Sequence, residues 1–152
     1  MTMLERIAAA RDSGDLDALV QAIPYARFLG LSARLEADSV LVTMKYAPHL
    51  VGNPTLPALH GGTLGALLES AAIFELLWAS ETIVLPKTIT ITVDFLRSGA
   101  PIDTHARGVI TRHGRRVANV RALAWQDDPA RPIASAHAHF LIMREGAPAA
   151  GP

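Results

Sequence analysis

The sequence has 152 residues and contains no cysteine, which excludes disulfide bonds, thiolate metal sites and cysteine nucleophiles. It also lacks an excess of charge of either sign, because Lys and Arg together number 14 and Asp and Glu together number 14. A neutral chain has no general electrostatic attraction to nucleic acid or to an anionic membrane. We therefore expect neither as a partner, and any basic patch must be local.

Long uninterrupted hydrophobic runs are missing as well. The most apolar stretch, residues 64–79, is interrupted by Glu69 and Glu75 and is too short to span a bilayer. Residues 1–6 lack the basic-then-apolar pattern of a signal peptide. Half of the residues are apolar and 18% are charged, which is typical of one globular domain. These features predict a cytoplasmic protein.

The chain divides into three parts by pattern. Residues 1–30 predict one or two short helices, the second of which would end at Pro24. Residues 31–145 predict the main domain. Residues 146–152 are rich in Gly, Ala and Pro and predict a disordered tail.

The sequence pattern of the main domain predicts one helix among many strands. Residues 63–78 are apolar nearly all round, as in a helix at the centre of a core. Residues 40–46 and 88–95 alternate as strands do, with Thr88, Thr90, Thr92 and Asp94 on one polar face. Residues 104–112 and 116–125 predict a hairpin, and residues 133–143 predict the last strand.

One face of the hairpin and of the last strand consists almost entirely of small residues. Close packing needs small side chains where something bulky approaches, and the predicted helix is the only bulky candidate. The sequence therefore predicts an α+β hotdog fold, in which a long antiparallel sheet wraps around one central helix. The residues of this face are Ala118, Val120, Ala122, Ala124, Ala134, Ala136 and Ala138.

The segment His60-Gly61-Gly62 leads directly into the predicted helix. Glycines allow a ligand to approach the backbone closely, and the first N–H groups of a helix lack partners at the positive end of its dipole. A thioester carbonyl placed there would gain an oxyanion site. The alternative interpretation is that Gly61-Gly62 forms only a turn.

Glu69 is the strongest candidate for an acid–base residue. No Lys or Arg lies three or four positions away on the helix, and burial without a partner would raise the pKa of this carboxyl toward the range of a general base. The alternative is a carboxylate that reaches water at the rim of the sheet. Glu75 lies six positions further on, on another side of the helix, and is the weaker candidate.

Asn53, His60-Gly61-Gly62 and Glu69, with the apolar helix and the strand run 88–98, resemble the hotdog thioesterases of the phenylacetate-degradation (PaaI) type. The resemblance covers residues 20–144. It implies that Glu69 activates water as a base or attacks the thioester as a nucleophile, and that the Gly61 N–H polarises the carbonyl. It further implies that Gly62 lies against the substrate. His60 would help to hold the loop and the thioester, Asn53 would position water or substrate, and Thr88 would supply a hydroxyl to the water.

The same resemblance implies the partners of the enzyme. The substrate would be an acyl-CoA with a medium-chain or aromatic acyl group, hydrolysed without any cofactor, since coenzyme A is itself part of the substrate. Two subunits would share each active site, and such dimers would pair again into tetramers. The loop between Asn53 and His60 is about one residue longer than is usual in the family, and many relatives carry Asp in place of Glu69. The pattern leaves open whether the thioester is carried by CoA or by a carrier protein.

Two further clusters of side chains are candidates for binding phosphate groups or a metal ion. Arg112, Arg115 and Arg116 at the hairpin tip match the phosphates of CoA, and the alternative is a solvated turn. His137 and His139 share a strand face, and with no cysteine and no suitably spaced acid they predict exposed strand histidines, with no metal site.

Two other functions share the fold. A hotdog-fold enoyl-CoA hydratase or dehydratase also uses a His before the helix and an acid on it, but the position of Gly61-Gly62 directly after His60 favours hydrolysis. A non-catalytic acyl-CoA-binding module is the other alternative, and Glu69 argues against it.

Overall fold

The computed structural model describes residues 1–80 and 84–142, so the predicted tail 146–152 and Met143 lie outside the described residues. Three short helices precede the sheet: α1 (Met3–Ser13), α2 (Leu16–Gln21) and α3 (Pro24–Leu29). The strands and the long helix follow as β1 (Leu31–Glu36), β2 (Ser39–Met44), β3 (Val51–Asn53), β4 (Ala58–Leu59), α4 (Gly61–Ala79), β5 (Lys87–Phe95), β6 (Thr104–His113), β7 (Val117–Trp125) and β8 (Ala134–Leu141). A 3-10 turn, Pro48–Leu50, precedes β3.

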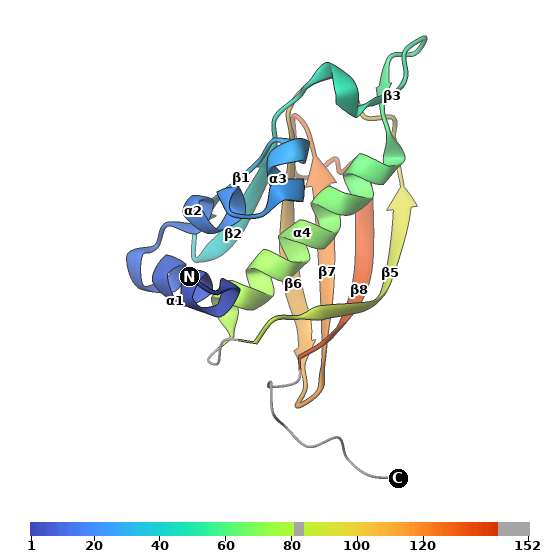
Figure 1. Ribbon diagram of the computed structural model, residues 1–152. Coiled ribbons are helices and arrows are strands. Elements are labelled where there is room, and N and C mark those ends of the chain that lie inside the picture. Colours follow the sequence, from blue (N-terminus) through green and yellow to red (C-terminus); the bar gives the residue numbers. More distant parts are fainter. Residues whose placement is uncertain (81–83, 143–152) are drawn as a thin grey trace.

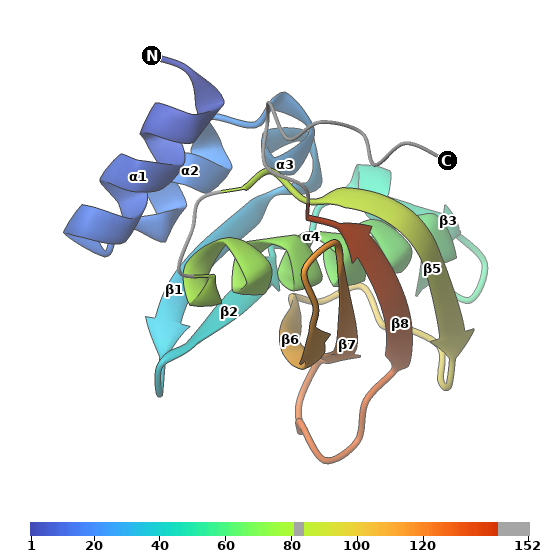
Figure 2. The same cartoon turned by 90° about the horizontal axis from the view of Figure 1, so that it is seen from below.

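A six-stranded antiparallel sheet in the order β1-β2-β6-β7-β8-β5 wraps around α4 (Figures 1 and 2). The alanines of β7 and β8 that face the helix are at most 2% exposed. The sheet approaches the helix closely at Gly108 of β6, where an added Cβ would lie 3.1 Å from the carbonyl oxygen of Ala71 and 3.2 Å from the Cα of Ala72. The predicted hotdog fold is confirmed, and the small residues allow the sheet to pack closely on α4, as their pattern indicated.

The helix α4 is long and apolar enough to cross a membrane by length and composition alone. Its apolar side chains pack in the core of the fold instead, against β2, β6, β7 and β8. Its hydrophobicity is therefore that of a core helix.

The N-terminal part forms three helices where one or two were expected. Pro24 does not end the second helix: it begins α3, because a proline at the first helical position loses no hydrogen bond. Strand β1 follows directly and was not predicted. Its inward residues Leu31 and Ala33 are buried, but the strand is too short for its alternation to stand out.

The strand β5 lies at the edge of the sheet opposite to α1–α3 (Figure 1). Its pairing with β8 contains a bulge, because Thr88 pairs with Phe140 whereas Thr90 pairs with His139. The prediction that Thr88 shares a face with Thr90 was therefore wrong. A bulge inserts one extra residue and turns a side chain to the other face, so Thr88 faces the helix and Thr90 faces away from it.

Candidate active site

The residues before α4 are held in place by short contacts to β3. The His60 N–H donates to the Leu50 carbonyl oxygen at 2.8 Å. An added Cβ on Gly52 would lie 2.8 Å from the Cα of His60, so only glycine fits at that position. Neither Gly52 nor its packing was anticipated from the sequence, since the contact joins two strands across a hairpin.

His60 is the N-terminal capping residue of α4. Its Nδ1 accepts a hydrogen bond from the Gly62 N–H at 2.8 Å, and its carbonyl oxygen accepts one from the Thr63 N–H at 3.0 Å. Gly62 is exposed and its N–H is already used. The ring of His60 therefore fixes the start of the helix.

The N–H of Gly61 remains at the positive end of the helix. Within residues 1–80 and 84–142 no acceptor takes a hydrogen bond from it. The ring of Phe95 lies beside it, since an added Cβ on Gly61 would be 3.1 Å from two ring carbons. A free donor beside an aromatic wall is suited to an oxygen on which negative charge develops.

Glu69 lies two turns further along α4 and is half-buried. Thr88, turned toward the helix by the bulge, donates its hydroxyl hydrogen bond to Oε1 of Glu69 at 2.6 Å. The structure therefore brings together two of the residues predicted for the site, because the carboxylate of Glu69 and the hydroxyl of Thr88 are hydrogen-bonded.

Glu75 has a different environment from Glu69. It is buried, and its Oε2 accepts hydrogen bonds from the Val40 N–H at 2.8 Å and from the Ser39 hydroxyl at 3.2 Å. This carboxylate joins α4 to the start of β2. The sequence identified it only as the weaker catalytic candidate, because partners 35 and 36 positions away leave no local signal.

The remaining predicted site residues lie apart from this pair in one chain. Asn53 is exposed on β3, and its Oδ1 accepts a hydrogen bond from the Thr55 N–H at 2.9 Å. Gly61 and Glu69 are separated by eight residues of α4, about 12 Å along the axis at 1.5 Å per residue. The free N–H and the carboxylate of a single chain are thus well separated along the helix.

The predicted arginine cluster lies at the turn between β6 and β7. Arg112, Arg115 and Arg116 are exposed and line a surface hollow of about 480 Å³ with Val117 and Asn119. Arginine side chains that converge in this way can bind phosphate groups.

The two strand histidines lie on the face of the sheet that points away from α4. Both are exposed, and His139 lies with its Nδ1 3.2 Å from the Thr90 hydroxyl. Nowhere in the described part of the chain do three His, Asp or Glu side chains gather as a metal site would need.

Comparison with known proteins identifies the family. Residues 52–141 match the model of the acyl-CoA thioesterase N-terminal domain. The medium/long-chain acyl-CoA thioesterase YigI of Escherichia coli K12 is 30% identical in an alignment of 134 positions that covers 79% of this chain and 86% of that protein.

Solved structures agree with the fold. A protein of Chromobacterium violaceum is 36% identical, with a TM-score of 0.76 over 93% of this chain and 98% of that chain. A phenylacetic acid degradation-related protein of Ralstonia eutropha shares the fold at 24% identity, with a TM-score of 0.71 over 84% of this chain and 99% of that chain. The chain therefore belongs to the acyl-CoA thioesterase family and is a thioester hydrolase of the hotdog fold.

Proposed function

We propose that this enzyme hydrolyses an acyl-CoA to free CoA and a carboxylic acid in an active site shared by two copies of the chain. The observation that carries the proposal is the arrangement along α4. One end presents the free Gly61 N–H, and two turns later Glu69 is paired with Thr88.

Each residue has a defined part in the proposed reaction. The carbonyl oxygen of the thioester accepts the Gly61 N–H, which stabilises the negative charge that forms there. Glu69 of the other copy removes a proton from water that attacks the carbonyl carbon, and this proton is passed to the departing sulfur. Alternatively Glu69 attacks that carbon itself and forms a mixed anhydride, which water then hydrolyses to the carboxylic acid, restoring the carboxylate and supplying the proton of the thiol. In both routes the C–S bond breaks, and the sulfur leaves as the thiol of CoA. His60 keeps the Gly61 N–H in position, and Thr88 orients the carboxylate.

The edge strand β5 supports the pairing of two copies. An uncovered edge presents backbone groups that can pair with another strand, and Ile89 and Phe95 on β5 are 53% and 58% exposed. One end of β5 contacts Gly61 through Phe95, and the other end contacts Glu69 through Thr88. If the β5 strands of two copies pair in antiparallel fashion, the Phe95 end of one strand lies against the Thr88 end of the other. Each free N–H would then lie near the other copy's carboxylate.

The substrate specificity is the finer part of the proposal. The apolar surface of α4 supports a medium-chain or aromatic acyl group, and the name of the Escherichia coli relative supports an aliphatic one. Arg112, Arg115 and Arg116 would bind the CoA phosphates, and Asn53 and Gly62 would contact the substrate near the carbonyl. The reaction as proposed needs no cofactor. Release of CoA from a panel of acyl-CoAs, ranked by kcat/KM beside an acyl-carrier-protein thioester, tests this part.

Gly61→Pro tests the oxyanion donor directly. Proline has no N–H, is well tolerated at the first position of a helix, and requires an extended preceding residue, which His60 already is with ψ 130°. We expect kcat to fall roughly 100- to 1,000-fold, as for the loss of one oxyanion donor. Gly61→Ala adds the same Cβ beside Phe95 but keeps the N–H, so it is the matched control and should retain most activity. Equal losses in both variants would contradict the assignment.

Mixing two inactive variants tests the shared site. Gly61→Pro removes the N–H and Glu69→Gln removes the carboxylate of the proposed site. In a mixed dimer one of the two sites carries both substitutions and the other carries neither, so one site is intact. After subunit exchange, an equal mixture should regain about one quarter of wild-type activity, because half of the dimers are mixed and each has one working site. No recovery, with mixed dimers demonstrated by mass spectrometry, would refute a site shared between copies.

The oligomeric state and the cellular location complete the proposal. The dimers are expected to pair into tetramers, which sedimentation at several protein concentrations measures. The enzyme is expected in the cytoplasm, which fractionation of cells producing the tagged chain measures.

A further inference from the structure

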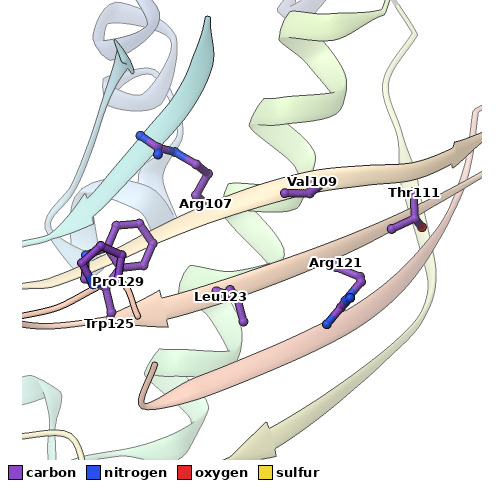
Figure 3. Close-up of a pocket in the computed structure, with 7 residues that line it drawn as sticks. All are labelled: Arg107, Val109, Thr111, Arg121, Leu123, Trp125 and Pro129. Carbon is purple, nitrogen blue, oxygen red and sulfur yellow. The ribbon is translucent and has the colours of Figure 1, made fainter. Parts of the chain in front are cut away.

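A second hollow lies on the face of the sheet that points away from α4 (Figure 3). Its volume is about 330 Å³, and its walls come from β6, β7 and the loop that follows β7. The site proposed above uses the helix side of the same sheet, so this hollow is separate from it. Its lining residues are Arg107, Val109, Thr111, Arg121, Leu123, Trp125 and Pro129.

The floor of this outer hollow is apolar. Val109 is 60% exposed and Leu123 is 38% exposed, although both lie in the middle of central strands. Trp125 is half-buried beside them. The outward face of an antiparallel sheet is usually polar, so neighbouring exposed apolar residues in a concave surface indicate a ligand-binding site.

Among the strands that form this floor the charge is of one sign, whereas the loop that supplies Pro129 also carries Asp127 and Asp128. Strands β6, β7 and β8 contain no Asp or Glu, although the whole chain is neutral. Arg107 is partly neutralised by Glu36, whose Oε1 is 3.2 Å from its Nη2. Arg121 is exposed and forms no ion pair with any residue of the described ranges. The hollow therefore combines an apolar floor with one uncompensated cation and one partly compensated cation.

This charge pattern disfavours a second copy of the chain as the occupant. A two-fold contact centred on the hollow would bring Arg121 of one copy close to Arg121 of the other, which is a repulsion of like charges. A volume of about 330 Å³ instead suits a small molecule. The complementary ligand has one anionic group and an apolar body.

We propose that the outer hollow binds an aliphatic carboxylate. The carboxylate group pairs with Arg121 at one side of the hollow, and the alkyl chain lies over Val109, Leu123 and Trp125, while Arg107 at the opposite side points away from Arg121. Arginine suits this contact, since its planar guanidinium can bind both carboxylate oxygens. Hydrolysis of an acyl thioester releases a molecule of this class. That link to the enzyme's own product rests on the proposed function, whereas binding in the hollow does not.

Trp125 provides a direct measurement, because the chain has two tryptophans and the other is Trp78 on α4. In a Trp78→Phe background the emission reports on the outer hollow alone. We expect dodecanoate to change the Trp125 emission saturably, and dodecanol and dodecyltrimethylammonium to bind at least tenfold more weakly, since neither carries a negative charge.

Arg121→Gln in the same background should weaken dodecanoate binding roughly tenfold, as the loss of a charged contact does. Arg6→Gln is the matched control, because it removes an exposed arginine from α1, remote in the fold, and should leave binding unchanged. Equal affinity of the two variants, or of dodecanoate and dodecanol, would overturn the proposal. A smaller oligomer in Arg121→Gln than in Arg6→Gln would also overturn it, since the hollow would then be a subunit interface. The fluorescence result does not depend on hydrolysis, so failure of either proposal leaves the other to its own test.

Discussion

Glu69 and Glu75 stand on the same helix six residues apart, and we predict opposite consequences for their removal. Glu75→Ala removes the acceptor of the buried Val40 N–H, at 2.8 Å, and of the Ser39 hydroxyl, at 3.2 Å. Leaving a buried N–H unpaired costs about 1–3 kcal/mol, and losing an ordinary hydrogen bond costs about 0.5–1.5 kcal/mol more. We therefore expect the free energy of unfolding to fall by about 2–4 kcal/mol.

For a chain of this length, that loss corresponds to a fall in Tm of roughly 5–15 °C. Thermal unfolding followed by circular dichroism at one fixed protein concentration measures it, since the Tm of an oligomer depends on concentration. Glu75→Gln keeps an oxygen acceptor and should recover part of the loss. The kcat of both Glu75 variants, measured well below their Tm, should stay close to that of the wild type.

Glu69→Gln is the comparison. It keeps an acceptor for the Thr88 hydroxyl, so its Tm should stay near that of the wild type while its hydrolysis of acyl-CoA falls steeply. The reasoning is refuted if Glu75→Ala unfolds at the wild-type temperature. It is equally refuted if Glu75→Ala abolishes activity in a folded protein while Glu69→Gln retains it.

Three further predictions follow from separate contacts. Thr88→Val should lower kcat about 10- to 100-fold in a steady-state assay of CoA release, as the loss of a hydrogen bond to a charged group does, and unchanged kcat would contradict a catalytic contribution of the hydroxyl. Gly108→Ala should destabilise the protein by about 1–3 kcal/mol in urea unfolding, because its Cβ would press on the backbone of α4, and a stabilised variant would show that the helix can move away. Hydrogen bonds from Arg34 and then Arg107 lower the pKa of Glu36, so the stability from this carboxylate is present above its usual pKa and is lost as the pH falls through the lowered value. Glu36→Gln should consequently differ less from the wild type in acid than at neutral pH, and a constant difference would contradict this.

The fold was predictable because its strongest signals are local. Residues 63–78 are apolar on every side, and the strands facing them carry alanine at alternate positions, so the sequence alone requires a helix enclosed by a sheet. The structure agrees within two residues at the start of α4 and one at its end. The free N–H at the start of α4 was predictable for the same reason, since the first N–H groups of any helix have no partner within it.

The parts that were missed depend on contacts distant in sequence. The bulge that turns Thr88 toward Glu69 is set by pairing with β8, so strict alternation placed the threonine on the wrong face. The anchoring function of Glu75 depends on Val40, which is 35 positions away. The resemblance to a family assigned Thr88 to the site as a hydroxyl for the water, because a family motif retains information on tertiary contacts, but it did not predict the hydrogen bond from Thr88 to Glu69.

The hairpin of β3 and β4 holds the start of α4 at its base, independently of the length of the loop at its tip. At its base the Leu50 carbonyl and Gly52 hold His60, while residues 54–57 at its tip are exposed and project from the body (Figure 1). Insertions at the tip can change what the loop touches without moving the capped start of α4. In evolutionary terms the tip of the hairpin is a place where the loop can vary in length while the start of α4 stays in position, and the additional residue that the family resemblance implies between Asn53 and His60 would be a variation of that kind.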